Sequence, residues 1–539
     1  MRAIMGLLGL VLTFSGVTAA QNASVIVPTE SGLVQGVIEG DVRAFRAIPF
    51  AAPPVGDLRW RSPAAPAQWS GIRDASTFGN VCPQLDSIFS GNFVGNEDCL
   101  VLNVYAAANL DPHAGQPVMV FFHGGGDVGG STQNGPFGSP PPPLATHGVV
   151  VVTAEYRLGA LGFFAHPLLA IEGQGSSGNY ALMDQIAALA WVQHNIRNFG
   201  GDPARVMAFG ASSGAGDVQA LLTSPAAQGL FSRAGIESDA IPPNEAKPLE
   251  TAEADQAPLV ALVGCGSAPD VLACLRAVPA SVLVTNQFAV PIDFVLEPRV
   301  LPEDPFVVLQ RNGSPVPLLI GSNREEITST SFFGDLTQPI TADQYAADVH
   351  AQFDLFGPTV ADQVLALYPV SAYDAANWAL VAVDSDFDLN ICIVRNTARA
   401  ALGPGENPNF PQHAPVWRYL FTHRFENDAS LNALRAFHGA QTYFISGNFN
   451  RVLGGNYTPT SAELAFSSTV MGYWTRFAAN GDPNGPGVLH WPRYSADDLL
   501  LQLDVTPARL AGYHNPQCDF FTPILNTLCS FPGQCPTNP

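Results

Sequence analysis

Three apolar runs and one helix-like segment constrain the fold of this chain more than any other feature. The runs 117–126, 148–159 and 204–210 are rich in Val, Phe and Ala and end at glycine, as short buried strands do. Residues 181–196 carry apolar residues at helical spacing, and the FGGDP segment at 199–203 would end that helix. Strands that alternate with helices form a mostly parallel sheet, so we predict an α/β fold with helices on both faces of a large central sheet.

Flanking segments extend this predicted sheet. Residues 21–50 alternate polar and apolar side chains between glycines, a pattern typical of antiparallel hairpins. Residues 315–323 predict a further strand that ends in a turn, and residues 215–224 can follow the third strand as a helix. The proline-rich segments are too short to be domain linkers, so we predict a single domain over residues 21–539.

The first twenty residues have the three parts of a secretory signal peptide. Arg2 supplies a positive charge, residues 4–14 form an apolar run, and residues 17–20 are small. The alternative is a signal anchor that is retained, but the apolar run is short for a membrane span. We therefore predict a signal peptide over residues 1–20, a secreted extracellular protein and no stable membrane anchor.

Charge argues against two classes of partner. The net charge is −22, and Lys247 is the only lysine. Such a surface repels nucleic acid and anionic membranes, so we expect neither as a partner. With 47% hydrophobic and 13% charged residues, the chain should bury a large core.

Eight cysteines and three glycosylation sequons fit an oxidising compartment. Sequence alone does not fix how the cysteines pair, although Cys265 and Cys274 are close enough to close a small loop. The sequons at Asn22, Asn312 and Asn456 predict surface positions that can be glycosylated.

Residues 210–214 fit the pattern G-x-S-x-G with Ser212 at its centre. A sharp turn between strand and helix needs small neighbours, and it leaves the central hydroxyl exposed at the end of the strand. Ser213 does not fit, because Ala215 stands where the second glycine is needed. The motif is short enough to occur by chance, and the strand before it and the helix after it strengthen the prediction that Ser212 is a nucleophile.

A second glycine motif, His123 to Gly126, also ends a buried strand. A phosphate-binding P-loop would need a following Lys and Ser or Thr at fixed spacing, which the sequence lacks. The alternative is an oxyanion hole, in which backbone N–H groups stabilise a negatively charged oxygen. Glycines suit this role because side chains would keep the N–H groups away from that oxygen. This second interpretation pairs naturally with a serine nucleophile.

A serine nucleophile needs a base and an acid that orients the base. In a chain with these two motifs, the acid follows the serine and the histidine comes last. The acid would be Glu325 or Glu326, directly after the strand at 315–323. Among the downstream histidines, His438 is followed by glycine and an apolar run, whereas His423 and His490 have charged or bulky neighbours typical of surface or packing residues. The remaining downstream histidines are His350, His413 and His514.

Ordered blocks along nearly the whole chain resemble the type-B carboxylesterase and cholinesterase-like lipase family of α/β-hydrolases. These blocks are RAIPFAAPPVGDLRW at 46–60, NEDCLVLNVY at 96–105, FFHGGG at 121–126, EYRLGALGFF at 155–164, residues 178–214, LFSRAGIES at 230–238 and WTRFAANGDPN at 474–484. The resemblance implies the α/β-hydrolase fold.

The resemblance also implies roles for individual residues. Ser212 matches the family's nucleophile, Glu326 its acid and His438 its histidine. Further matches are the oxyanion-hole residues Gly125, Gly126 and Ser213, the supporting Ser238, and the disulfides Cys82–Cys99, Cys265–Cys274 and Cys392–Cys518, which leave Cys529 and Cys535 as the remaining pair.

Four positions depart from the family pattern. Ala211 replaces the Glu that usually precedes the nucleophile, and Ser213 replaces an alanine. Asp127 replaces an aromatic residue after the glycines, and Asp217 stands where a small polar residue is common. A carboxylate near the mouth of the pocket would disfavour anionic substrates.

These observations predict a secreted serine hydrolase that cleaves carboxylic esters through an acyl-enzyme, without metal or cofactor. The loop between Cys82 and Cys99 is short and only mildly apolar, which favours small-molecule esters, soluble to moderately hydrophobic, over the long-chain lipid esters of a lipase or sterol esterase. The alternative of another class is a non-catalytic binding or adhesion protein on the same fold.

Overall fold

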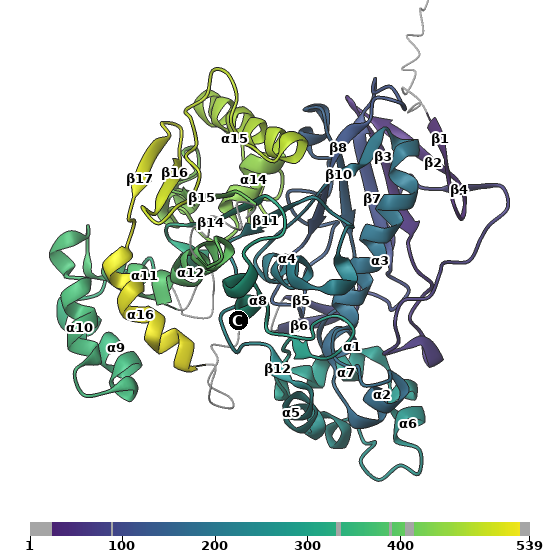
Figure 1. Cartoon of the computed structure of the whole chain (residues 1–539), viewed down its shortest axis with the longest axis horizontal. Coiled ribbons are helices and arrows are strands. Elements are labelled where there is room, and N and C mark those ends of the chain that lie inside the picture. The colour runs from purple at the N-terminus through teal and green to yellow at the C-terminus, as the bar shows by residue number, and fades with distance from the viewer. Residues whose placement is uncertain (1–23, 88–89, 330–335, 388–390, 405–413, 529–539) are drawn as a thin grey trace, which may run out of the picture.

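A mixed sheet of 13 strands crosses the molecule (Figure 1). The computed structural model describes residues 24–87, 90–329, 336–387, 391–404 and 414–528. The strands of this sheet are β1 (Ser24–Thr29), β2 (Gly32–Glu39), β3 (Val42–Pro49), β4 (Ile72–Asp74), β7 (Val101–Ala107), β8 (Gln116–Phe122), β9 (Val150–Ala154), β10 (Gly201–Ala211), β11 (Arg233–Glu237), β14 (Leu318–Asn323), β15 (Val416–Phe421), β16 (Leu499–Leu503) and β17 (Ala508–Ala511).

The centre of the sheet is parallel, and its two ends are antiparallel except that the short strand β4 pairs with β2 in parallel. The run β9-β8-β10-β11-β14-β15-β16 is parallel throughout. The run β1-β2-β3-β7-β9 is antiparallel, as is the pair β16-β17. The predicted hairpins at the N-terminus and the predicted mostly parallel sheet are therefore confirmed. Because parallel strands place their carboxyl ends at one edge, the residues after β8, β10 and β14 meet there.

Alternate residues of the central strands enter two separate hydrophobic cores. In β8, Val118, Val120 and Phe122 belong to the larger core, which also contains side chains of α3 and α4. Met119 and Phe121 belong to the second core, which contains side chains of α14 and α15. Since successive side chains of a strand point to opposite faces, helices cover both faces of the sheet, as predicted.

Helices also gather in two groups beside the sheet (Figure 1). One contains α9, α10, α11 and α16, which contact one another, and the other contains α1, α2, α5, α6 and α7. The helices are α1 (Gly159–Phe163), α2 (Pro167–Glu172), α3 (Tyr180–Asn195), α4 (Ser213–Thr223), α5 (Leu249–Leu262), α6 (Val271–Ala277), α7 (Ala280–Asn286), α8 (Pro305–Asn312), α9 (Ala342–Phe353), α10 (Val360–Leu367), α11 (Ala376–Phe387), α12 (Ile391–Ala401), α13 (Ala429–Ala433), α14 (Ala440–Ser446), α15 (Ser461–Asn480) and α16 (Asn515–Leu528).

Two short sheets complete the described structure: the hairpin β5 (Gln84–Ser87) with β6 (Ser90–Val94), and the pair β12 (Lys247–Pro248) with β13 (Val295–Leu296). Within the described ranges no single helix is both long and apolar enough to cross a membrane. Helix α6 and residues 280–289 meet that test only as a pair, which is bent by 99°.

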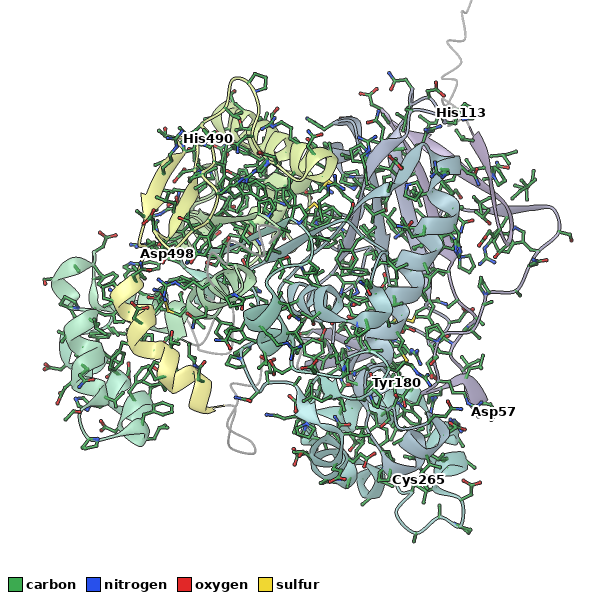
Figure 2. All side chains as sticks on the ribbon, in the orientation of Figure 1. Asp57, His113, Tyr180, Cys265, His490 and Asp498 are labelled. Carbon is green, nitrogen blue, oxygen red and sulfur yellow. A yellow bond between two sulfur atoms is a disulfide. The ribbon has the colours of Figure 1, made fainter. Side chains whose placement is uncertain are left out.

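Three disulfides join the cysteines that the family resemblance paired: Cys82–Cys99, Cys265–Cys274 and Cys392–Cys518. Figure 2 shows Cys265 at the end of the molecule formed by α5 and α6. Asn312 and Asn456 are exposed, as surface sequons must be. The signal peptide over residues 1–20, the sequon at Asn22 and the pair Cys529–Cys535 lie outside the described residues. The single domain over residues 21–539 stays a prediction.

Candidate active site

Ser212 lies on a strained turn between β10 and α4. Its φ and ψ are 57° and −141°, a conformation that a non-glycine residue rarely adopts. Its N–H donates to the carbonyl O of Glu237 at 2.9 Å. A Cβ at Gly210 would collide with the backbone of Gly214, and one at Gly214 would collide with the carbonyl of Phe122. Both glycines of the motif are therefore required by close backbone packing, and Ser212 remains partly exposed.

The glycine loop after β8 packs directly on this turn. A Cβ at Gly124 would overlap the side chain of Ser212. Gly125 and Gly126 have φ of 132° and 60°, which are left-handed values that favour glycine. Among the described residues the N–H groups of Gly125 and Gly126 have no acceptor. Ser213 is the first residue of α4, so its N–H has no partner within the helix. Three backbone donors thus lie around the turn.

The Ser213 hydroxyl also joins the two glycine motifs. The N–H of Asp127 donates to Ser213 Oγ at 3.1 Å. The sequence predicts only a backbone role for Ser213. The structure adds a side-chain role, which fixes the residue after the three glycines to the start of α4.

Glu326 and His438 contact each other across the edge of the sheet. Glu326 follows β14 and is fully buried. Its Oε2 lies 2.7 Å from His438 Nδ1, and its Oε1 accepts the N–H of Asn323. The N–H of His438 donates to the carbonyl O of Glu326 at 3.2 Å. Burial alone would lower the pKa of His438, but the hydrogen bond to Glu326 and the charges of Glu326 and Asp239 raise it.

Two amides connect this pair to the serine turn. Asn323 Nδ2 donates to Gln441 Oε1 at 2.6 Å, and Gln441 Nε2 donates to Ser238 Oγ at 3.2 Å. Ser238 directly follows Glu237, whose carbonyl holds the N–H of Ser212. Sequence reasoning missed Asn323 and Gln441, although both stand inside the segments GSNREE and FHGAQTYF that it used for the acid and the histidine.

The other candidate residues lie in different surroundings. Glu325 accepts from Arg324 Nε at 2.8 Å and from the N–H of Ala436.

His423 is buried between Asp504 and Glu463. His490 is exposed near α15 (Figure 2). His350 pairs with Asp354 at the surface, His514 pairs with Asp386, and His413 lies outside the described residues.

Three aspartates form an acidic group beside the glycine loop. Burial and the charge of Asp239 raise the pKa of Asp127 to about 7. Burial and the charge of Asp127 raise the pKa of Asp217, which is fully buried and accepts from Gln185 Nε2. One oxygen of Asp127 and one of Asp217 are buried without a hydrogen-bond partner among the described residues. The sequence does not predict a role for Asp239, because only the fold brings this residue to the glycine loop.

Glu237 brings a buried carboxyl close to Ala211, the position where the family resemblance expected Glu. Glu237 and Ala211 are paired residues of the neighbouring strands β11 and β10. Its Oε1 accepts from Trp474 Nε1 at 2.8 Å, and burial raises its pKa to about 8. At neutral pH this carboxyl is therefore mostly uncharged. No cluster of three or more His, Cys, Asp or Glu side chains in the described part of the chain is arranged to hold a metal ion.

Known proteins resemble this chain over most of its length. The profile of the carboxylesterase family matches residues 23–521. Fumonisin B1 esterase of Sphingopyxis macrogoltabida is 35% identical, over 86% of this chain and 84% of its own. Para-nitrobenzyl esterase of Bacillus subtilis (strain 168) is 32% identical, over 89% and 95%. A solved structure of PNB esterase superposes with a TM-score of 0.74 at 30% identity, covering 92% of this chain and 99% of its own.

Proposed function

The chain belongs to the carboxylesterase family, has the α/β-hydrolase fold and is a carboxylic ester hydrolase, and we propose that it works through a triad of Ser212, His438 and Glu326. The observation that carries this proposal is the 2.7 Å contact between His438 Nδ1 and Glu326 Oε2. Asn323 and Gln441 connect it to the turn that presents Ser212.

In the proposed reaction Ser212 Oγ attacks the ester carbonyl while His438 takes its proton. Glu326 orients the imidazole through Nδ1, so that Nε2 acts as the base, and it stabilises the imidazolium that forms. His438 then returns the proton to the leaving alcohol. Water attacks the acyl-enzyme in the same way, which releases the acid and restores Ser212.

The backbone N–H groups of Gly125, Gly126 and Ser213 would stabilise the oxyanion. Their support is the position of the glycine loop against Ser212 and the absence of other acceptors for Gly125 and Gly126 among the described residues. Loss of one such donor typically lowers the rate about 10²–10³-fold. Ser213 contributes a second effect, because its hydroxyl accepts the N–H of Asp127 and so holds the loop.

We propose soluble to moderately hydrophobic esters as substrates. The disulfide Cys82–Cys99 closes a short segment that contains the hairpin of β5 and β6. A hairpin of this size covers less apolar surface than a long lid would. Activity that rises sharply on triglyceride emulsions would contradict this substrate class and favour a lipase.

Secretion is the proposed localisation. It is supported by the signal-like N-terminus, the three disulfides and the exposed sequons at Asn312 and Asn456. Recovery of the mature chain from the culture medium, with residue 21 or a close neighbour as its first residue, would test it.

Labelling with a fluorophosphonate probe tests the nucleophile. We expect Ser212→Ala to abolish both labelling and hydrolysis of p-nitrophenyl acetate. The matched control is Ser213→Ala, which keeps the nucleophile and should still be labelled, although more slowly because the Asp127 N–H loses its acceptor. Labelled Ser212→Ala, or an inert wild type, would contradict the triad, and the inert wild type would favour a non-catalytic protein.

A further inference from the structure

A cavity of about 360 Å³ lies beyond the carboxyl ends of β14 and β15. Arg324 follows β14 directly, and Arg424 lies three residues after β15; the two strands are parallel neighbours. The third arginine of the cavity, Arg435, comes from the segment between α13 and His438. Crevices at the carboxyl ends of parallel strands are common ligand sites in α/β proteins. Glu326 and His438 are not among the lining residues, so the cavity is separate from the proposed triad.

The cavity has more cationic than anionic groups. Arg324 pairs with Glu325, and Arg435 pairs with Asp374 and lies 3.8 Å from Glu325. Arg424 is partly buried, and within the described residues it has no ion pair or hydrogen bond. Arg424 and Arg435 both line the cavity, and burial together with the charge of Arg424 lowers the pKa of Arg435. Asp386 does not compensate, because it binds Tyr368 and His514.

This positive site stands out in a strongly acidic chain. The protein has 24 basic residues and a net charge of −22. Structural ion pairs account for Arg324 and Arg435, whereas the Arg424 guanidinium has no ion-pair partner in the part of the chain that the structure describes. Five donors in a planar fork are suited to binding an oxyanion.

Aromatic rings form much of the remaining wall. The Arg435 guanidinium stacks on Trp378 at 3.5 Å from the ring centroid. Tyr513 stacks on His514 with centroids 4.0 Å apart, and Tyr373 lines the same space. The volume lies at the lower end of the range for small-molecule sites, which combine apolar walls with a few polar groups.

We propose that this cavity is a second binding site, for a small aromatic carboxylate. Arg424 binds the carboxylate, and the ring of the ligand packs against Trp378 and Tyr373. Asp374 is exposed at the rim, and its charge opposes the anion. The proposal does not depend on the triad, because neither Ser212 nor His438 contacts the ligand.

Calorimetric titration of the full-length mature chain with benzoate tests this site. We expect Arg424→Gln to weaken benzoate binding about tenfold, which corresponds to about 1.4 kcal/mol, because the carboxylate loses one charge-assisted hydrogen bond. We expect Asp374→Asn to strengthen binding about threefold by removing a repulsive charge at the rim. The matched control is Arg73→Gln, since Arg73 also lies over a tryptophan, Trp69, but on the far edge of the sheet.

The two variants change affinity in opposite directions, which misfolding cannot imitate. Benzoate that binds only in the ester site would give the same Kd in all four proteins, and this result would overturn the proposal. Wild-type protein that shows no heat of binding would also overturn it. Acetate, which lacks the ring, should bind about tenfold more weakly than benzoate if the aromatic wall contributes the area of one ring; equal affinities would refute the aromatic part.

Discussion

At the scale of single residues, the proposed triad predicts that Glu326 sets the pH range in which His438 acts as a base. The base must be neutral, and the contact with Glu326 raises the pKa of His438. Activity should therefore rise with pH through a value above the 6.5 of an ordinary histidine. We expect Glu326→Gln to move this acid limb of kcat/KM to lower pH, and to reduce kcat about 10³-fold or more because the imidazolium loses its partner.

The control for this prediction is Glu325→Gln, measured over the same pH range. Glu325 is bound to Arg324 and to the N–H of Ala436, so its loss should leave the acid limb where it is in the wild type. If the acid limb moved in Glu325→Gln but not in Glu326→Gln, Glu325 rather than Glu326 would be the acid of the triad.

A second prediction at this scale concerns the effect of Asp127 on stability. Its pKa is about 7 in the folded protein and 3.8 as an ordinary aspartate, so folding is favoured by the protonated form. The contribution of Asp127 to the free energy of unfolding should fall as pH rises from about 4 to 7, and Asp127→Asn should remove this contribution. We expect the variant to be about 1–3 kcal/mol more stable than the wild type at pH 8, and similar to it at pH 4.

Thermal unfolding at the two pH values measures this difference. The charges that face Asp127 are those of Asp217, Asp239 and His123. Asp57→Asn serves as a control, because Asp57 is exposed and lies at the edge of the molecule (Figure 2). A stability difference that is equal at pH 4 and pH 8 would mean that the Asp127 carboxyl is not protonated on folding.

At the scale of elements, His423 joins the end of β15 to the start of α15. Its ring lies between Asp504 and Glu463. Glu463 also closes a capping box with Thr460. Burial alone would lower the pKa of His423, but the two carboxylates raise it to about 9. Because this pKa exceeds the 6.5 of an ordinary histidine, the stabilisation that His423 contributes to the folded protein is complete below pH 6.5 and is lost as pH rises through 9.

We therefore expect His423→Gln to lower stability about 3–5 kcal/mol at pH 6, the usual effect of breaking a buried ion pair. At pH 10 the difference from wild type should be much smaller. Denaturant titrations at both pH values measure it. A difference that grows with pH would show that His423 is neutral in the folded protein.

The same elements show what a sequence can and cannot predict. The strands at 117–126 and 204–210 and the turn around Ser212 were predictable, because local apolar runs and closely packed glycines determine them. His438 could be assigned only through the family resemblance, since its local pattern is weak. Asp239, Gln441 and Glu237 were missed because their roles arise from strands and helices that lie far apart in sequence.

At the scale of the whole molecule, the disulfides differ in how much chain they restrain. Cys392–Cys518 joins α12 to α16 across 126 residues, whereas Cys265–Cys274 spans only 9. Helix α12 packs on β14 and α8, and α16 packs with the helical group of α9 to α11 (Figure 1). The long-range bridge therefore ties that group to the side of the sheet that carries Glu326.

Removing the two bridges should have unequal effects on stability. A loop-entropy estimate gives the longer bridge about 2 kcal/mol more stabilisation than the shorter one. We expect Cys392→Ser with Cys518→Ser to lower the denaturation midpoint more than Cys265→Ser with Cys274→Ser, when both are measured in urea against the wild type. Equal midpoints for the two double variants would show that native packing, rather than restraint of the unfolded chain, determines what each bridge contributes.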